Sequence, residues 1–547
     1  MLDHTRLTTK LTTSYNAEEK IWSGAGTQSS YNDDLTIAQL IFNQLQSEPE
    51  KVFQISIAEN TQLTRGQMLE NATKISAYLR QEGLIEESHN VGILARNTTH
   101  LAALAYGCLF NGTPFSAANP NMDEPKILDL FNLIKPQIIF CVAEDCGKAT
   151  SVANSLGAKI ITIDRSITGV TSIADILTTP LEKDYKPECF RRSRDSTIAI
   201  LHTSGSTGTP KAVTIPNNPI LFEAFSYLGV NDVQYTPSSL DWVSGLIKLI
   251  TSGINGTLSL ISEEPFSPAH FWTICENYNI SWAMLGVSQV ALLVNSPEIN
   301  ANQLKSIRYL IIVGGRIQPK TVATMESYLP GKGIQCMAYG MTEMVTPLAN
   351  NFSTHTKPTS VGRLLPIIRM RAVDENGKNL GPNEVGEIYI DHGQHWSGYY
   401  QNAVATNEMR DIEGWFHTGD LGYFDEDNYL YVVDRKKDLL KYMRMSYYPN
   451  EIEEVIAQMP EVAEVCVFGI WSELKGDAAT ASIVIREGST LKSTQVVDFV
   501  ASKISASYKH LHGGVQFVSN LARSPNGKVN RRAVKEAFLK ANQIEEK

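Results

Sequence analysis

Short apolar runs alternate with helix-like segments from about residue 35 to residue 433, and this alternation constrains the fold more than any other feature. The apolar runs are HNVGILA at 89–95, PQIIFCVA at 136–143, AKIITID at 158–164, STIAILH at 196–202, TLSLI at 257–261 and YLIIVGG at 309–315. Segments such as Leu63–Glu82 show helical periodicity between them. Because apolar strands separated by helices form parallel sheets, the sequence predicts an α/β fold of mostly parallel, helix-covered sheets.

The pattern changes in the last third of the chain. EVGEIYID at 384–391 and NYLYVVD at 428–434 are bounded by Gly, Asn and Asp, which favours antiparallel strands in a small sheet or barrel. A compact α+β unit is expected after Arg435, with helices near Asn450–Met459 and Thr494–Ser505, strands at 464–470 and 481–487, and a basic helix from Val529. The charged junction DRKKDLLKY is typical of an exposed linker about which domains rotate. We therefore expect a large domain over residues 1–434 and a small, mobile domain over 435–547.

The overall charge limits what the chain binds. Its 547 residues carry a formal net charge of −10, whereas general nucleic-acid binding needs a basic surface that attracts the phosphate backbone. Nucleic acid is therefore not an expected partner. A phosphate site in this chain must draw its positive potential from a few lysines, arginines and N–H groups inside a cleft.

The cysteines and the ends of the sequence predict a cytoplasmic protein without a membrane span. The seven cysteines form no CxxC pair and are odd in number, which is typical of free thiols in a reducing compartment. The beginning of the chain lacks the apolar core of a secretory signal, and its end, QIEEK, is not a Ser-Lys-Leu type of peroxisomal signal. The most apolar stretch, Leu101–Phe110, falls well short of the ~20 residues of a membrane span. The oligomeric state is not indicated.

A loop rich in glycine and hydroxyl residues, TSGSTGTPK, follows the apolar run that ends at His202. Its candidate phosphate ligands are Thr203, Ser204, Gly205, Ser206, Thr207, Gly208 and Lys211. The glycines permit positive φ and close approach of N–H groups to an anion, while the hydroxyls and the lysine add donors and charge. It is not a Walker A loop, because Pro210 precedes the lysine and Ala212 follows it. An ordinary Ser/Gly turn is the alternative.

The segment HTSGSTGTPKAV resembles the signature of the adenylate-forming superfamily, which includes acyl-CoA synthetases, 4-coumarate-CoA-ligase-like enzymes, insect luciferases and peptide-synthetase adenylation domains. Four further motifs follow in the order of that family: YGMTE at 339–343, GWFHTGD at 414–420, DRKKD at 434–438 and SPNGK at 524–528. The resemblance covers nearly the whole chain except about the first thirty residues. It implies ATP and Mg²⁺ as cofactors and a small carboxylic acid as substrate.

The resemblance implies roles in nucleotide binding for residues around two glycine-containing motifs. Tyr339 contacts adenine, Gly340 allows close approach, Thr342 lies near the α-phosphate with a catalytic role, and Glu343 helps to bind Mg²⁺. Gly314 and Gly315 belong to the same nucleotide site. Read alone, YGMTE is more typical of a helix N-terminus with a capping Thr.

Further roles follow from the later motifs. The resemblance implies that Asp420 binds the ribose, that Arg435 reaches ribose or phosphate, and that Lys437 is the hinge of the small domain. Lys528 resembles the lysine that catalyses adenylation, and Lys441 is a further catalytic candidate. The alternatives are an N-cap aspartate for Asp420, a solvated charge run for DRKKD and a surface lysine for Lys528.

The sequence departs from the family in three places that concern the acid and the acceptor. Arg316 follows the paired glycines, where a small residue is usual, and either alters the acid pocket or meets an anionic group. The stretch Pro237–Gly245 lacks the histidine of luciferases and offers Trp242 as a pocket aromatic or as a core residue. Arg444 stands where a glycine usually lines the path of CoA, so it either hinders CoA or contacts its phosphate.

The predicted function is ATP- and Mg-dependent activation of a carboxylic acid to an acyl-adenylate, followed by transfer to CoA. Two alternatives stay open. A luciferase-like monooxygenase would oxidise an adenylated luciferin with O₂, and a non-catalytic relative would bind nucleotide or acyl ligand without turnover. The joint presence of Glu343, Asp420, Arg435 and Lys528 argues against the second.

Overall fold

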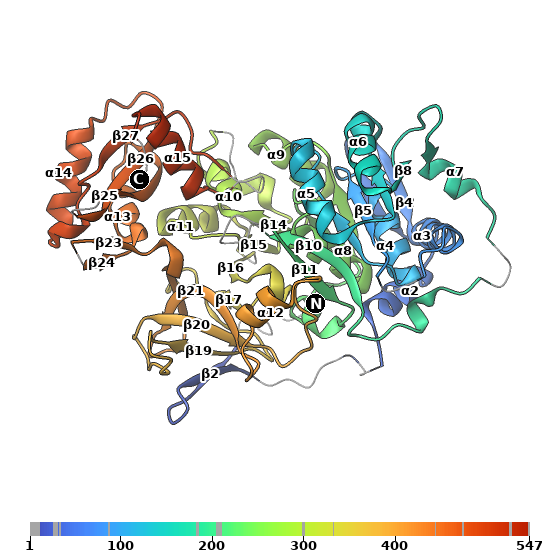
Figure 1. Ribbon diagram of the computed structural model, residues 1–547, viewed down its shortest axis with the longest axis horizontal. Helices are drawn as coiled ribbons and strands as arrows, with labels where there is room; N and C mark the ends of the chain where they lie inside the picture. Colours follow the sequence, from blue (N-terminus) through green and yellow to red (C-terminus); the bar gives the residue numbers. More distant parts are fainter. Residues whose placement is uncertain are drawn as a thin grey trace.

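The computed structural model describes residues 11–25, 31, 34–85, 88–181, 185–203, 210–297, 301–331, 333–443, 445–472, 475–523 and 528–544. Within these residues, three sheets and their helices form a large N-terminal part, and a fourth sheet forms a smaller C-terminal part (Figure 1). This confirms the predicted fold class.

The first large sheet has seven strands in the order β11-β10-β6-β5-β7-β8-β9. Their bounds are β5 Val91–Leu94, β6 Phe115–Ala117, β7 Ile138–Cys141, β8 Lys159–Thr162, β9 Thr171–Ser172, β10 Thr197–Thr203 and β11 Lys211–Pro216. All neighbours are parallel except β10 and β11. The runs at 89–95, 136–143, 158–164 and 196–202 thus form the predicted parallel strands.

The second large sheet has nine strands in the order β18-β17-β16-β15-β14-β12-β13-β3-β4. Their bounds are β3 Val52–Ser56, β4 Thr61–Thr64, β12 Val233–Tyr235, β13 Leu258–Ile261, β14 Trp282–Gly286, β15 Tyr309–Val313, β16 Ile334–Tyr339, β17 Ala349–Asn351 and β18 Arg363–Leu364. The six strands from β16 to β3 are parallel, and the two ends of the sheet are antiparallel.

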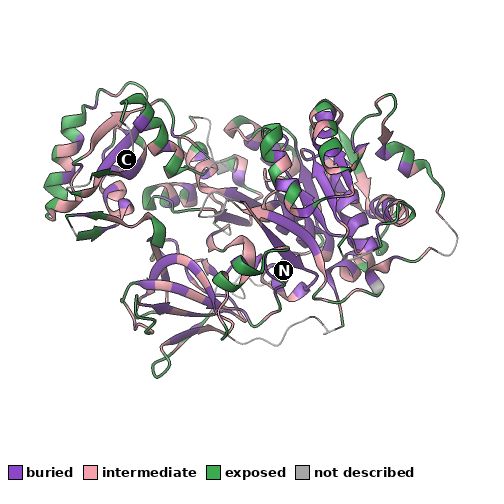
Figure 2. Cartoon of the chain, in the orientation of Figure 1, coloured by how far each residue is buried: buried purple, intermediate pink, exposed green. Residues whose placement is uncertain are grey.

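Helices pack between the two large sheets and on their outer faces. Their bounds are α2 Ile37–Gln46, α3 Arg65–Gln81, α4 Leu101–Asn111, α5 Glu124–Ile134, α6 Cys146–Leu156, α7 Ile173–Thr178, α8 Val243–Asn255, α9 Pro268–Tyr278, α10 Val287–Val294, α11 Pro319–Tyr328 and α12 Ala403–Met409. The largest core cluster joins α2, α3, α4 and α8 to strands of both sheets, whereas α5 and α6 cover one outer face and α9 to α11 the other. Nearly every residue of α4 is buried, as its all-round apolar sequence requires (Figure 2).

A third sheet of six antiparallel strands adjoins the large sheets, in the order β1-β2-β19-β20-β21-β22. Its strands are β1 Thr13–Asn16, β2 Ile21–Gly24, β19 Arg369–Val373, β20 Gly386–Asp391, β21 Phe416–Phe424 and β22 Leu430–Arg435. The antiparallel prediction for 384–391 and 428–434 is confirmed, and the element is a sheet rather than a closed barrel. Two strands from the beginning of the chain join it, as the blue β2 beside the gold strands shows in Figure 1.

The C-terminal part is an α+β unit with its own core. Its elements are β23 Leu440–Tyr442, β24 Met445–Tyr447, α13 Pro449–Ile456, β25 Val462–Ser472, β26 Gly476–Ile485, α14 Ser493–Lys503, β27 Gly514–Phe517 and α15 Arg531–Ala541. The predicted helices near 450–459 and 494–505 and the basic helix after Val529 correspond to α13, α14 and α15. In Figure 1 this unit lies at one end of the molecule, beside α10 and α11.

Candidate active site

Several predicted site residues gather where strands of different sheets end. β10 ends at Thr203, β15 ends directly before Gly314 and β16 ends at Tyr339. The carboxyl ends of parallel strands are the usual place for ligands in α/β sheets. The antiparallel strands β21 and β22 contribute residues at the same place.

Asp420 is the centre of a hydrogen-bonded group of three side chains. Its carboxylate Oδ2 accepts a hydrogen bond of 2.6 Å from the hydroxyl of Tyr339. Its Oδ1 lies 2.7 Å from Nε of Arg435, which faces Asp420 across the β21–β22 pair. Asp420 is buried within a strand, so it does not cap a helix.

The environment fixes the charge states of this group. Desolvation raises the pKa of Asp420, while Arg435 and the Tyr339 hydroxyl oppose the rise. Burial beside the carboxylate raises the pKa of Tyr339 well above its ordinary value. Desolvation lowers the pKa of Arg435, but Asp420 together with the other acidic groups around it outweighs that effect, and the net shift is upward. Tyr339 therefore stays a hydrogen-bond donor and Arg435 a cation.

A second group joins Glu343 to Lys211 through a residue that the sequence did not single out. Glu343 lies in the short 3₁₀ turn η5, Thr342–Met344, and its Oε1 accepts a hydrogen bond of 2.7 Å from the hydroxyl of Tyr399. The ammonium of Lys211 lies 4.8 Å from the centre of the Tyr399 ring, a cation–π distance. Tyr399 pairs with Val213 of β11 in an isolated bridge, and this long-range pairing leaves no signal in the local sequence.

The η5 turn ends in a strained backbone. Val345 has φ +60° and ψ −50°, which a β-branched residue rarely adopts. The N–H of Thr346 donates to the carbonyl of Met344 at 2.6 Å, closing a three-residue turn around Val345. Such strain concentrates at functional sites. Thr342 is the first residue of η5 and does not act as a helix cap, because the N-cap position is Met341.

Lys528 lies against Gly314, so the small domain reaches into the site. A Cβ placed on Gly314 would be 3.1 Å from Cε of Lys528, and φ of Gly314 is +97°, which disfavours other residues. Desolvation between the two parts and the charge of Arg435 lower the pKa of Lys528, whereas Asp420 raises it. The structure therefore brings Lys528 to the group around Asp420, although Ser524 to Gly527 lie outside the described residues.

Arg316, which follows Gly315, meets an anionic group, one of the two possibilities that the sequence left open. Its guanidinium pairs with the carboxylate of Glu454 in α13. Arg486 of the small domain also donates to Asn295 Oδ1 of the large one, at 2.8 Å. Charged contacts thus accompany Lys528 across the same boundary.

Lys441 does not lie with the other predicted site residues. It is an exposed residue of β23, paired with Ser446 of β24, and Figure 1 shows this hairpin on the side of the small domain away from β16. The structure therefore does not bring Lys441 to the group around Asp420. Arg444 lies outside the described residues.

Only the two ends of the phosphate loop are described. Ser204, Gly205, Ser206, Thr207 and Gly208 lie outside the described residues. Thr203 and Lys211 face each other across the β10–β11 pair, so the loop connects two adjacent antiparallel strands. His202, just before it, makes a 2.9 Å hydrogen bond through Nε2 with the hydroxyl of Ser116.

Arg531 ties the junction between the two parts to the helix that follows Lys528. Its guanidinium lies 3.0 Å from Asp438, 3.0 Å from Glu453 and 3.7 Å from the buried Asp434. Desolvation raises the pKa of Asp434 to about 6, against the effect of Arg531. The DRKKD segment is thus only partly a solvated charge run, since Lys437 is exposed but both aspartates are paired. The sequence did not single out Arg531.

Among the described helices, none combines the length and apolar character needed to cross a membrane. Within the same residues, no three His, Cys, Asp or Glu side chains gather as a metal site.

Comparisons with known proteins identify the family to which the chain is related. Residues 41–400 match the AMP-binding enzyme family and residues 451–528 match the AMP-binding enzyme C-terminal domain. The chain is 28% identical to a luciferin 4-monooxygenase of Photinus pyralis, over 88% of this chain and 90% of that protein. It is 25% identical to a probable 4-coumarate–CoA ligase 1 of Dictyostelium discoideum, over 91% and 95%.

The fold is also found among solved structures. ATP-bound MatB from Rhodopseudomonas palustris superposes with a TM-score of 0.83 at 22% identity, covering 93% of this chain and 100% of that one. The family match at residues 41–400 spans well over half of the sequence. The chain belongs to the AMP-binding, adenylate-forming enzyme family.

Proposed function

We propose that the protein activates a carboxylic acid with ATP to give an acyl-adenylate and pyrophosphate, and then transfers the acyl group to CoA. The observation that carries the proposal is the position of Lys528 against Gly314, next to Asp420 and Arg435. Lys528 comes from the C-terminal part of the chain and lies beside the proposed nucleotide ligands Asp420 and Arg435. This position supports a reaction in which a cation is needed next to the bound nucleotide.

The first step joins two anions. An oxygen of the substrate carboxylate attacks the α-phosphorus of ATP, and the bond from that phosphorus to the pyrophosphate oxygen breaks. The Lys528 ammonium lowers the repulsion between the carboxylate and the phosphate and holds them in line. Thr342 offers a hydroxyl to the α-phosphate from the η5 turn.

The rest of the nucleotide has candidate ligands on both sides of Lys528. Asp420 accepts hydrogen bonds from the ribose hydroxyls, and Arg435 stabilises this carboxylate or reaches a phosphate. Tyr339 contacts adenine, with Gly340, Gly314 and Gly315 allowing close approach. The pyrophosphate portion is proposed to bind the loop of Thr203, Ser204, Gly205, Ser206, Thr207, Gly208 and Lys211.

Glu343 fits the role of a Mg²⁺ ligand. Mg²⁺ in nucleotide enzymes is held by one or two carboxylates together with phosphate oxygens and waters, so one well-placed glutamate suffices. The ion supplies charge neutralisation for the departing pyrophosphate. Tyr399 orients the Glu343 carboxylate through its 2.7 Å hydrogen bond.

The second step is proposed to need a rotation of the small domain. We place the boundary between residues 434 and 435 and the hinge at Lys437, an exposed residue of the 3₁₀ turn η6, Lys436–Asp438. Rotation would withdraw Lys528 and bring Lys441 and Arg444 toward the acyl-adenylate. The CoA sulfur then attacks the acyl carbon and AMP leaves.

One experiment tests the proposal and its alternative. The protein is incubated with ATP, Mg²⁺ and a panel of fatty and aryl acids, with and without CoA, and pyrophosphate, thioester and light are recorded. We expect pyrophosphate with at least one acid and a thioester when CoA is present. Light with a luciferin would favour the monooxygenase reaction that the Photinus relative's name describes. Absence of pyrophosphate with every acid would contradict the proposal.

A further inference from the structure

Arg316 of the large domain forms an ion pair with a helix of the small one. It lies two residues after Gly314, which Lys528 contacts, and its guanidinium pairs with the carboxylate of Glu454 in α13. The side chains of Arg316 and Glu454 are 39% and 45% exposed. An ion pair this exposed adds little to the stability of a fold, so its effect lies in the arrangement of the two domains that it connects.

The residue next to Glu454 holds the helix that follows Lys528. The carboxylate of Glu453 accepts a hydrogen bond of 3.0 Å from Arg531, the first residue of α15 and three residues after Lys528. Adjacent glutamates of α13 thus bind one arginine close in sequence to Gly314 and another close in sequence to Lys528. Contacts therefore run from Lys528 through Arg531 and α13 back to the segment of Gly314.

Arg316 faces acidic groups of both domains. Desolvation lowers its pKa, while Asp434, Glu453 and Tyr423 raise it, and a guanidinium remains a cation in proteins. Asp434, at the end of β22, belongs to the large domain. Glu453 and Glu454 belong to the small domain, so Arg316 loses both carboxylates when that domain turns away.

A second contact between the domains depends on the same arrangement. Arg486 of the small domain donates to Asn295 Oδ1 at 2.8 Å. Arg486 also donates to the carbonyl of Pro460 of its own domain at 3.0 Å. The amide of Asn295 donates to the carbonyl of Ala291 in α10 at 2.7 Å. Because this contact remains, loss of the Arg316 ion pair should weaken the arrangement of the domains rather than abolish it.

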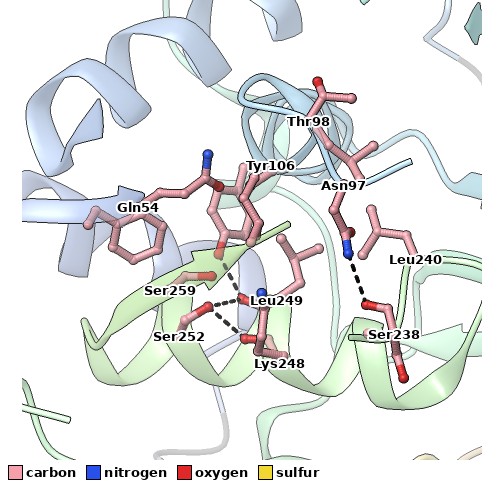
Figure 3. A pocket seen from close by; sticks show the side chains of 15 residues that line it. Gln54, Asn97, Thr98, Tyr106, Ser238, Leu240, Lys248, Leu249, Ser252 and Ser259 are labelled. Carbon is pink, nitrogen blue, oxygen red and sulfur yellow. Dashed lines mark hydrogen bonds between the residues drawn. The ribbon is translucent and has the colours of Figure 1, made fainter. Parts of the chain in front are cut away.

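Lys248 of α8, by contrast, is a basic residue of the core. Its ammonium donates to the carbonyl of Leu260 at 2.7 Å, beside a cavity of about 20 Å³ between α4, α8 and the nine-stranded sheet (Figure 3). That volume is room for about one water. Lys248 therefore ties α8 to β13, whereas Arg316 connects the two domains.

We propose that Arg316 is a positioning residue for adenylation. Its ion pair with Glu454 holds the small domain where Lys528 lies against Gly314, and the pair must break before that domain turns for transfer of the acyl group. The inference rests on the proposed function. Because the pair favours only the arrangement in which it forms, it raises the fraction of protein able to adenylate and lowers the fraction able to transfer.

The test measures the two steps separately in single turnovers. Pyrophosphate release is followed with ATP and an accepted acid, and thioester formation is followed from the prepared acyl-adenylate and CoA. The ratio of the first rate to the second reports the ratio of the two domain arrangements. Arg316→Met and Glu454→Gln should each lower this ratio about two- to fivefold, the effect of one exposed ion pair.

Charge exchange separates this role from a simple loss of stability. Arg316→Glu or Glu454→Arg alone places like charges together and should lower the ratio further, whereas the two changes combined should recover part of the loss. Glu451→Gln is the matched control. Glu451 lies on the same helix but pairs with Lys509 of the same domain, and a glutamine keeps the hydrogen bond from the Tyr448 N–H. The ratio should be unchanged in this control.

A measurement that needs neither reaction reports the same arrangement. Cysteines introduced by Asn295→Cys and Arg486→Cys would face each other across the boundary between the domains. Since the seven native cysteines are buried, a short bismaleimide should join the introduced pair. Adding Arg316→Met should slow this crosslinking about two- to fivefold.

The outcomes separate this inference from the proposed function. An unchanged rate ratio in Arg316→Met, or an unchanged crosslinking rate, would overturn the inference and leave adenylation standing. A ratio that falls in Arg316→Met but not in Glu454→Gln would also overturn it, because Arg316 would then act on a bound substrate. Absence of pyrophosphate with every acid would instead contradict the proposed function, and crosslinking would still test whether Arg316 holds the domains together.

Discussion

Lys528 of the small domain packs against Gly314 of the large one, so closely that a Cβ on Gly314 would be 3.1 Å from Cε of the lysine. A side chain added at Gly314 would therefore move Lys528. Gly315, its neighbour, has no such contact, since a Cβ there would meet only Val287, at 4.0 Å.

Gly314→Ala should therefore slow adenylation without removing ATP binding. The added methyl group displaces Lys528 and also strains a backbone at φ +97°. We expect kcat for pyrophosphate release to fall about tenfold or more, because small displacements at a reacting centre have large effects. Gly147→Ala in helix α6, where an added Cβ would have no neighbour within 4 Å, is the control and should remain close to the unmodified protein. Equal kcat values for the two variants would show that the contact with Lys528 has no role.

Asp420→Asn tests the nucleotide group. The amide keeps the shape of the side chain but removes the charge that pairs with Arg435 at 2.7 Å and the acceptor strength toward Tyr339. KM for ATP should rise about tenfold or more, as expected for the loss of a charged hydrogen bond. Asp427→Asn, at an exposed partner of Lys357, serves as the control and should leave KM unchanged. A KM for ATP that Asp420→Asn does not alter would argue against ribose binding there.

Arg531→Met tests the junction between the two parts. The change leaves the buried Asp434 and its neighbours Asp438 and Glu453 without their shared cation, and breaking such a group costs about 3 kcal/mol. The free energy of unfolding should fall by about that amount, and pyrophosphate release should slow because Lys528 precedes this helix. The adjacent Arg532 pairs with Glu536 in an exposed i,i+4 bridge. Arg532→Met should change the free energy of unfolding by about 0.5 kcal/mol or less. Similar decreases in both variants would show that Arg531 has no special role at the junction.

Acid should destabilise the protein partly through His202. Burial lowers the pKa of its imidazole to about 4, below the ordinary value of about 6.5 in an unfolded chain. Between these two values the unfolded state binds more protons, so the free energy of unfolding decreases as pH falls from about 6.5 toward 4 and is unaffected by this group above that window. Urea unfolding at a series of pH values should show a shallower slope in His202→Asn. An unchanged slope would mean that the native state protonates this ring freely.

Much of the fold follows from local patterns in the sequence. The apolar runs that became β5, β7, β8, β10, β13 and β15 are short and bounded, and helix α3, Arg65–Gln81, agrees with the predicted segment within two residues at each end. The N-terminal strands β1 and β2 were not foreseen, because their four-residue segments carry little periodicity and gain stability only by pairing with β19.

Some residues of the candidate site could likewise be predicted from the sequence, and others could not. Residues within contiguous motifs, such as Tyr339 and Asp420, could be proposed from sequence, and the structure brings these two within hydrogen-bonding distance. Tyr399 and Arg531 could not, because their importance comes from partners that lie far along the chain, Glu343 for one and Asp434 for the other. The ion pair of Arg316 with Glu454 likewise depends on how the two parts meet.

The role proposed for Lys528 in adenylation is tested most directly by measuring pyrophosphate release by Lys528→Ala and Lys441→Ala with an accepted acid. Lys528→Ala should lose at least about a hundredfold in kcat, as for removal of a transition-state charge, while Lys441→Ala should retain pyrophosphate release. Undiminished pyrophosphate release by Lys528→Ala would contradict it.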